Sequence, residues 1–350
     1  MDYQISTLSV CEHCYRHVHA TKFEKNGSIW LEKTCPTHGT VTHLIEPDGQ
    51  FYLDYKYHRH ALQSYFVEVT NKCNLACPHC YQMPDNLSTD PTITFLLEKI
   101  KSWPDDGYPV ALVGAEPTTR KDLPNIIRSI QSLPGKTRGV MILTNGVNMS
   151  NRSYVENFVG IPDLTWTFGL NHPDYQGHKV REKQIEGIKN CTELGLVIKN
   201  ISYTLEDMSQ LEYCLKEIQE FGTSICQQYR VRCGADIGRT PSGPQIYLSD
   251  LVKETKKLCE KYNWSYEEDM HGNRAHYSVK INGLPLKIIQ WPDATTLDLS
   301  ETQTEAIADI LPGQPPSPLV HQVILRDGAI NKKLPLLDTI PKEWIDNYGK

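Results

Sequence analysis

One stretch of the chain joins a strand-like run to three closely spaced cysteines: Glu68-Val69-Thr70-Asn71-Lys72-Cys73-Asn74-Leu75-Ala76-Cys77-Pro78-His79-Cys80-Tyr81. The cysteines have the spacing C-x3-C-x2-C and directly follow the apolar, β-branched run 65–70. Such a run predicts a buried strand, so the cysteines lie on the loop that leaves its carboxyl end. Three thiolates on one loop suit an iron–sulfur cluster, which four cysteines normally complete. One iron would therefore be left to bind a group that is not protein.

The motif, with the aromatic Tyr81 directly after it, resembles the signature of the radical S-adenosylmethionine (SAM) superfamily. The resemblance implies that Cys73, Cys77 and Cys80 bind a [4Fe-4S] cluster whose open iron holds SAM, with Tyr81 beside the cofactor. It further implies that the reduced cluster cleaves SAM to a 5′-deoxyadenosyl radical, which takes a hydrogen atom from the substrate. The spacing alone leaves a second interpretation, a zinc site made from the three cysteines with His79 or a distant ligand.

Length and composition describe an ordinary globular protein with one large domain and one or two small additions. The chain has 350 residues, 39% of them hydrophobic, and a net charge of −6, which gives no reason to expect general affinity for nucleic acids. No apolar run approaches the roughly 18 residues that span a membrane, and no signal peptide is evident. Eleven cysteines, several in metal-ligand spacings, indicate a reducing cytosol. We therefore expect a cytoplasmic protein.

Residues 1–45 carry a second set of metal ligands, Cys11, Cys14, Cys35 and His38, around a hairpin signal at Asn26-Gly27. Three thiolates and one imidazole close a tetrahedral site, so we expect a zinc-ribbon-like module with a structural metal. Zinc is the first interpretation, mononuclear iron the second, and another iron–sulfur cluster the third. The C-P-x-H-G form of the second ligand pair resembles the N-terminal module of one radical SAM branch. That branch includes the archaeal tetraether-lipid synthase and the pterin-methylating enzymes.

Residues 62–240 alternate strand-like and helix-like segments, which predicts a parallel α/β domain. Six strands imply a partial (β/α)6 barrel that is open on one side, with its chemistry at the carboxyl ends of the strands. The expected strands are 65–70, 109–113, 139–143, 164–170, 197–204 and 228–232. Residues 241–350 are expected to form a small α/β cap, with a helix at 249–262, a hairpin over 276–291 and a strand at 320–325.

Two short motifs after the second and third strands resemble SAM-binding segments of the superfamily. Gly114-Ala115-Glu116-Pro117 is similar to its G-G-E-P motif, whose backbone binds the SAM amino group, but Ala115 replaces the second glycine. Alanine tolerates fewer backbone conformations, which puts the fine geometry there in doubt. Thr144-Asn145-Gly146 matches the T-N-G motif at the end of the third strand.

Two further candidates follow the fourth and sixth strands. By the same resemblance, Asn171 is expected to contact the SAM ribose or the substrate, and Arg232 to lie at the mouth of the barrel. We expect only one of Arg230 and Arg232 to point into the barrel. Cys233, at the same strand end, is a candidate hydrogen-atom donor to a product radical, although a buried inert thiol is the simpler interpretation.

The function predicted from these features is hydrogen abstraction from an unactivated C–H bond of a small molecule or nucleotide. C–C bond formation, methyl or alkyl transfer, or rearrangement would follow, with an electron donor such as flavodoxin or ferredoxin. One alternative is a radical isomerase of a modified nucleotide, as in phage-type thymidine hypermodification. Another is a non-catalytic zinc-binding adaptor. Nucleic-acid binding through the ribbon has only its basic residues in support, and those are more simply a solvated face. No catalytic side chain is assigned.

Overall fold

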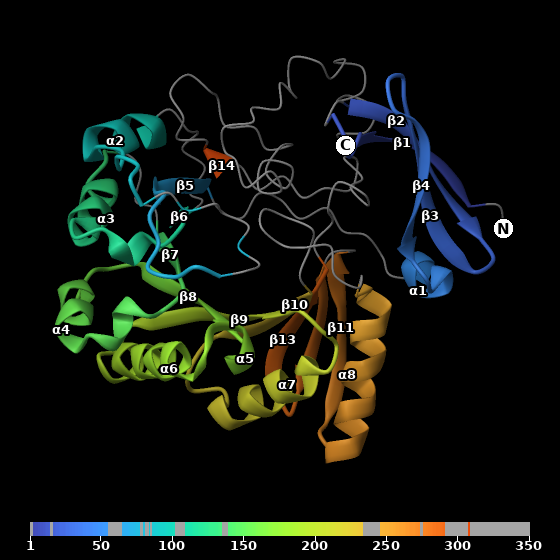
Figure 1. Ribbon diagram of the computed structural model, residues 1–350. Helices are drawn as coiled ribbons and strands as arrows, with labels where there is room; N and C mark the ends of the chain where they lie inside the picture. Colours follow the sequence, from blue (N-terminus) through green and yellow to red (C-terminus); the bar gives the residue numbers. More distant parts are fainter. Residues whose placement is uncertain are drawn as a thin grey trace.

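A computed structural model describes residues 3–14, 17–54, 65–77, 80, 84, 86–101, 109–134, 139–233, 246–273, 276–290 and 307–308. Within these residues the strands form two sheets, one of four strands and one of ten (Figure 1). None of the helices in this part of the chain has the length and apolar character that crossing a membrane requires.

The N-terminal sheet is antiparallel, and its strands are neighbours in chain order. The turn between its second and third strands has positive φ at Asn26 (54°) and Gly27 (78°). Two such residues match the right-handed twist of paired strands, so the hairpin lies where the sequence predicts it. The four strands are β1 Gln4–Val10, β2 His17–Lys25, β3 Ser28–Cys35 and β4 Gly39–Glu46.

The large sheet is built on six parallel strands that are also neighbours in chain order. Each of the six lies within one or two residues of its expected position, which confirms the partial barrel of parallel strands. They are β5 Tyr65–Thr70, β6 Val110–Gly114, β7 Val140–Thr144, β8 Leu164–Asn171, β9 Val197–Leu205 and β10 Gln228–Cys233.

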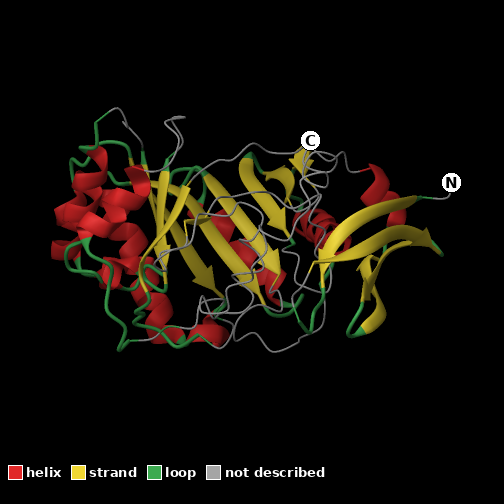
Figure 2. Ribbon diagram, turned by 90° about the horizontal axis from the view of Figure 1, so that it is seen from above, coloured by secondary structure: helices red, strands yellow, loops and turns green. Residues whose placement is uncertain are grey.

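Helices cover the outer side of this curved sheet (Figures 1 and 2). Alternate side chains of each strand point to the helices and pack in one continuous core, as Trp166, Phe168 and Leu170 of β8 do. The other side of each strand forms what we call the inner face. The helices are α2 Ile93–Lys101, α3 Leu123–Gln131, α4 Arg152–Val155, α5 Pro173–Gln176, α6 His178–Glu193, α7 Gln210–Phe221 and α8 Leu248–Tyr262.

The C-terminal strands extend the large sheet at both of its edges. β13 (Leu284–Ile289) pairs in parallel with β10 and is followed outward by β12 (His276–Ile281) and β11 (Tyr266–Asn273). The predicted hairpin is therefore present, but it continues the barrel sheet instead of lying over the open side. β14 (Ile307–Ala308) pairs with β5 at the opposite edge. The predicted strand 320–325 lies outside the described residues, and the three-part division of the chain stays a prediction.

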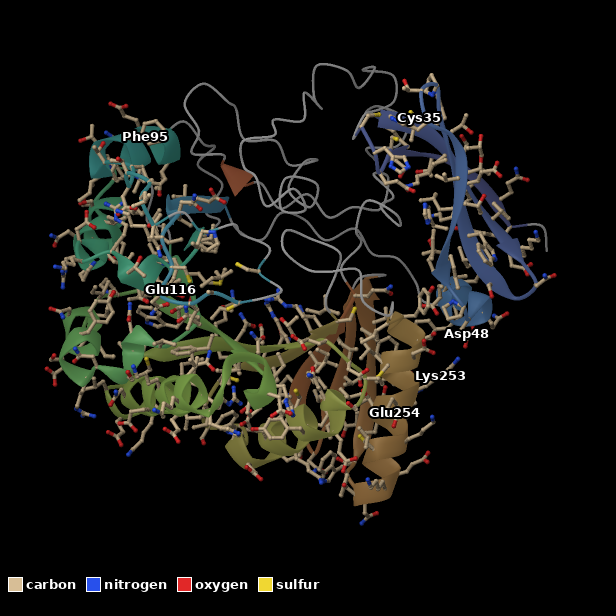
Figure 3. All side chains as sticks on the ribbon, viewed as in Figure 1. Cys35, Asp48, Phe95, Glu116, Lys253 and Glu254 are labelled. Carbon is tan, nitrogen blue, oxygen red and sulfur yellow. The ribbon has the colours of Figure 1, made fainter. Side chains whose placement is uncertain are left out.

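The N-terminal sheet contacts the barrel at the start of α8, through the last residue of β4 and the segment that follows it. Ser249 donates through its backbone N–H (3.3 Å) and its hydroxyl to the buried carboxylate of Glu46. Lys253 pairs with Asp48 at 2.8 Å (Figure 3), and α1 (Gly49–Asp54) brings the Phe51 ring against Tyr277 of β12. The same short segment thus contacts both a helix and a strand of the barrel's edge.

Candidate active site and metal centre

The four ligands predicted in the N-terminal module come together. Their ligand atoms all lie within 4.8 Å of one another. The Cys14 and Cys35 sulfur atoms are 3.8 Å apart, and His38 Nδ1 is 3.5 Å from the sulfur of Cys11 and of Cys35. A tetrahedral zinc with Zn–S bonds of about 2.3 Å has S–S edges of about 3.8 Å. The side chains therefore already have the spacing of a closed four-ligand metal site.

The electrostatics of this group favour a bound cation. Burial acts to raise the pKa of the Cys35 thiol, but hydrogen bonds from Thr37 and His38 outweigh it and lower the pKa to about 6. A thiolate is the form that ligates a metal, so Cys35 is prepared for this role near neutral pH.

The loop after β5 carries the three cysteines of the central motif. The backbone N–H of Cys73 donates to Asn86 Oδ1 at 2.9 Å, and Leu75 N–H donates to the Cys73 sulfur at 3.3 Å. Burial raises the pKa of the Cys73 thiol to about 11, and the Glu116 carboxylate and the thiols of Cys77 and Cys80 add to this rise. The three thiols are thus near enough to influence one another. Tyr81 lies outside the described residues.

The end of β6 is bonded directly to the start of this cysteine loop. Ala115 N–H donates to the Thr70 carbonyl and Glu116 N–H to the Lys72 carbonyl, both at 3.0 Å. Gly114 permits the approach, because a Cβ on it would lie 2.2 Å from the Thr70 oxygen. Its φ of +129° is a conformation that other residues rarely adopt. Ala115 does not have a positive φ, which explains why alanine is accepted where the superfamily motif has glycine.

Glu116 lies just below the carboxyl ends of the parallel strands, which form the rim of the barrel. It connects the loops that follow β6 and β7. Its side chain is 1% exposed. One carboxylate oxygen accepts from the Thr118 N–H (3.1 Å) and from the hydroxyls of Thr118 and Thr144 (both 2.6 Å), and the other from the Asn145 N–H (2.6 Å). Burial raises the pKa of this carboxyl, although the hydrogen bonds act to lower it. Glu116 therefore fixes the T-N-G loop relative to the G-A-E-P loop.

We expect Glu116→Ala to lower the free energy of unfolding by about 3 kcal/mol or more. The change removes the shared acceptor and leaves the buried donors of Thr118 and Thr144 without it. Urea unfolding of the purified protein measures the effect. The matched control is Glu193→Ala, which breaks a half-exposed ion pair with Arg152 and should cost less than about 1 kcal/mol. Equal losses in the two variants would contradict this role of Glu116.

A network of amide side chains connects the T-N-G loop to the cysteine loop. Asn145 Nδ2 donates to Asn74 Oδ1 at 2.8 Å, and Asn74 Nδ2 donates to Asn148 Oδ1 at 3.1 Å. Asn145 Nδ2 also lies 3.9 Å from the Cys73 sulfur. From α6, Gln184 donates to the Asn145 carbonyl at 2.8 Å. The predicted Asn145 thus lies beside the cysteine motif, held by residues that the sequence did not single out.

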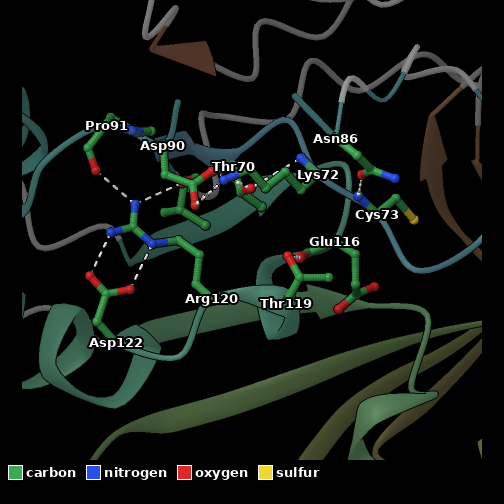
Figure 4. Close-up of polar contacts among 11 residues, drawn as sticks. Thr70, Lys72, Cys73, Asn86, Asp90, Pro91, Glu116, Thr119, Arg120 and Asp122 are labelled. Carbon is green, nitrogen blue, oxygen red and sulfur yellow. Dashed lines mark hydrogen bonds and ion pairs between the residues drawn. The ribbon is translucent and has the colours of Figure 1, made fainter. Parts of the chain in front are cut away.

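Arg120, to which the sequence assigned no role, lies near the start of the cysteine loop (Figure 4). Its buried guanidinium donates to the carbonyls of Val69 (2.9 Å) and Pro91 (2.8 Å) and pairs with Asp122. Arg120 therefore connects the end of β5, the segment after the cysteine loop and the start of α3. An arginine inside a strand–loop–helix connection was the available signal, but the two carbonyl groups that it binds are more than 28 positions away.

Asn171 and Arg232 lie level with each other at the carboxyl ends of their strands, because both are in register with Thr204. Arg232 Nε donates to the Thr204 hydroxyl at 2.8 Å. The expectation that only one of Arg230 and Arg232 points inward is wrong, because residues two apart on a strand share a face. Cys233 lies on the other face, 3% exposed in the helix-side core, which argues against a role as hydrogen-atom donor.

The donor set fits an iron–sulfur cluster. Three thiols share one loop, and the remaining cysteines outside the N-terminal module are buried in the helix-side core, so none of them offers a fourth ligand. They are Cys191, Cys214, Cys226, Cys233 and Cys259. Around the motif, the predicted Gly114, Ala115, Glu116, Thr144 and Asn145 come together within one bonded unit. Asn171 and Arg232 lie at the same rim, on the strands that follow.

Comparisons with known proteins agree with both parts of the site. Residues 4–47 match the model of the HMPTM N-terminal zinc ribbon domain, and residues 67–218 match that of the radical SAM superfamily. The chain is 25% identical over 227 residues to the 7,8-dihydro-6-hydroxymethylpterin dimethyltransferase of Methanocaldococcus jannaschii, covering 54% of this chain and 44% of that protein. The chain thus spans less than half the length of this relative.

Two further similarities concern the barrel. A "Probable GTP 3',8-cyclase" of Methanococcus aeolicus is 26% identical over 248 residues, covering 68% of this chain and 80% of that protein. The structure of Streptococcus suis SuiB bound to S-adenosylmethionine superposes with a TM-score of 0.51 at 15% identity, covering 81% of this chain and 71% of that one. At this identity the superposition shows a shared fold alone. The chain thus carries a zinc ribbon domain at residues 4–47 followed by a domain of the radical SAM superfamily at residues 67–218, and this order resembles the branch whose members carry such an N-terminal ribbon.

Proposed function

We propose that the protein is an enzyme that binds a [4Fe-4S] cluster through Cys73, Cys77 and Cys80 and uses SAM as its second cofactor. When bound, the reduced cluster would cleave SAM to a 5′-deoxyadenosyl radical that takes a hydrogen atom from an unactivated C–H bond. The observation that carries the proposal is the bonding of the cysteine loop to two other strand-end loops. A protein that only binds metal and presents a surface to a partner would not need hydrogen bonds between these three loops.

In this proposal the chain's own residues position the cofactors and do little of the bond-making chemistry. The backbone of residues 114–116, the Asn145 side chain and Asn171 are the groups that would orient SAM, and Glu116 would fix the first two relative to each other. Arg232 would face SAM or the substrate from across the barrel. The N-terminal site would hold zinc, since three thiolates and one imidazole suit zinc better than a redox-active metal.

For the substrate we propose a small molecule or nucleotide. Two of the relatives, a pterin dimethyltransferase and a probable GTP cyclase, support a compound built on a fused nitrogen-containing ring. Methyl or alkyl transfer and ring formation are accordingly the first outcomes to look for, and rearrangement of a modified nucleotide is the second candidate. A flavodoxin or ferredoxin in the cytoplasm would supply the electron.

The test is anaerobic reconstitution with iron and sulfide, followed by metal analysis and electron paramagnetic resonance (EPR) of the reduced protein. We expect about four irons per chain in addition to one zinc, a cluster signal that shifts when SAM is added, and release of 5′-deoxyadenosine. Colourless protein that contains zinc alone and does not respond to SAM would overturn the enzyme proposal and favour the adaptor.

A further inference from the structure

The side-chain amide of Asn145 is oriented by contacts on both of its sides. Its Oδ1 accepts from the Val147 backbone N–H at 3.0 Å. Because a backbone N–H only donates, this contact identifies the oxygen and places Nδ2 on the other side of the amide. There Nδ2 donates to Asn74 Oδ1 at 2.8 Å and lies 3.9 Å from Cys73 Sγ, a long hydrogen bond to the larger sulfur atom. The two hydrogens of one NH2 group thus serve an amide oxygen and a sulfur.

Two further amides continue the same order of donors and acceptors. Asn74 Nδ2 donates to Asn148 Oδ1 at 3.1 Å, and Asn148 Nδ2 donates to the Thr118 carbonyl at 3.0 Å. We call Asn145, Asn74 and Asn148 the amide chain. A carbonyl only accepts, so Thr118 sets the direction of the chain from this end, as the backbone N–H of Val147 does from the other. Turning the Asn145 amide over would bring like atoms together at both of its contacts.

The backbone of Asn145 is held in place as well. Its N–H donates to the buried Glu116 carboxylate at 2.6 Å, and its carbonyl accepts from Gln184 Nε2 at 2.8 Å. Asn145 is therefore fixed through its backbone N–H and carbonyl and through both polar atoms of its side chain. A donor that is already in position needs no rearrangement when charge develops on the neighbouring atom. The Nδ2 group of Asn145 is such a donor for the sulfur of Cys73.

The Cys73 sulfur has donors on two sides. The Leu75 backbone N–H donates to it at 3.3 Å, in addition to the Asn145 contact. As a thiol, Cys73 can itself donate to Asn74 Oδ1, which lies 3.9 Å away. A cysteine that ligates a metal has lost this proton, so its sulfur only accepts, and hydrogen bonds to a charged acceptor are the stronger ones. In the ligating state, the contacts from Leu75 and Asn145 are therefore the ones that remain.

Resting on the proposed function, we propose that Asn145 raises the reduction potential of the iron–sulfur cluster by donating to the Cys73 thiolate, and that Asn74 positions it to do so. Reduction adds negative charge to the cluster and its sulfur ligands, and an N–H directed at a sulfur stabilises that charge. Hydrogen bonds to the sulfurs are among the factors that set such potentials. Asn145 Oδ1 has a second lone pair, so the side chain can still orient SAM. The amide chain thereby lets a weaker electron donor reduce the cluster.

The test is a redox titration of the reconstituted full-length protein, followed by EPR and carried out without SAM so that it depends neither on SAM binding nor on catalysis. In Asn145→Ala we expect the ratio of reduced to oxidised cluster at a given potential to fall about tenfold, a reduction potential about 59 mV lower for a one-electron couple. The matched control is Asn157→Ala, which removes an exposed amide that also makes two hydrogen bonds. Its potential should equal that of the wild type, and an equal or higher potential in Asn145→Ala would overturn the proposal.

A double variant tests whether Asn74 acts through Asn145. Asn74→Ala should lower the potential by a smaller amount, and adding it to Asn145→Ala should lower the potential no further. Additive decreases would overturn the positioning role of Asn74.

Two further results separate this inference from the proposed function. If Asn145→Ala does not take up four irons, Asn145→Asp provides the comparison. It keeps an oxygen for Val147 and nearly the same size but has no N–H for Cys73, so its potential should also be lower than that of the wild type. A SAM-dependent EPR shift together with unchanged potentials would leave the proposed function standing and remove only this inference. Failure of the wild type to take up iron would overturn both.

Discussion

Cys77→Ala is expected to abolish 5′-deoxyadenosine formation without unfolding the protein. Two thiolates cannot replace three in holding a cluster that already lacks a fourth cysteine ligand. The loop itself is held by backbone hydrogen bonds at residues 70–73 and by the Asn74 and Asn145 side chains, not by the thiol of Cys77 alone. Iron content, the EPR signal and SAM cleavage should therefore fall to background, while the thermal unfolding midpoint of the metal-free barrel changes little.

The matched variant is Cys35→Ala in the N-terminal module. It removes one of four ligands at the closed site, so zinc content should fall while the four irons remain. Measuring both metals in both variants separates the two sites. Loss of zinc in Cys77→Ala, or a persistent SAM-responsive EPR signal in that variant, would show that the cysteines have been assigned to the wrong metals.

Gly114→Ala is expected to lower the free energy of unfolding by about 3 kcal/mol or more. The new Cβ would lie 2.2 Å from the Thr70 carbonyl oxygen, and the φ of +129° is strained for any residue with a side chain. Relief requires the end of β6 to move away from the cysteine loop, which breaks the hydrogen bonds from Ala115 and Glu116. Urea unfolding measures the loss, and iron reconstitution should fail as well.

Gly160→Ala and Ala115→Gly are the controls for this prediction. Gly160 also has a positive φ, +76°, but no atom lies within 4 Å of its missing Cβ, so only the backbone strain of about 1 kcal/mol remains. Ala115→Gly restores the superfamily's glycine at a position without positive φ, and we expect SAM binding to change little. If Gly114→Ala were as stable as Gly160→Ala, the close contact with Thr70 would not be essential.

The sequence predicted the parts of the fold and site that depend on local pattern. Periodicity placed the six parallel strands, and ligand spacing identified Cys11, Cys14, Cys35 and His38. It did not predict that Glu116 points into the protein, because a motif marks a loop without giving the direction of each side chain. It also could not pair Lys287 with Arg230, since parallel pairing depends on how distant segments meet in three dimensions.

The pairing of β14 with β5 has a consequence for how the protein is made. β5 leads directly into the cysteine loop, yet its outer neighbour is residues 307–308, more than two hundred positions later in the chain. A ribosome that synthesises the chain from its N-terminus exposes the cysteine loop long before this neighbour exists. Until then β5 is an open sheet edge, and the loop lacks part of its final support. We therefore expect loading of iron and sulfide to follow the pairing of β14 with β5, late in the synthesis of the chain.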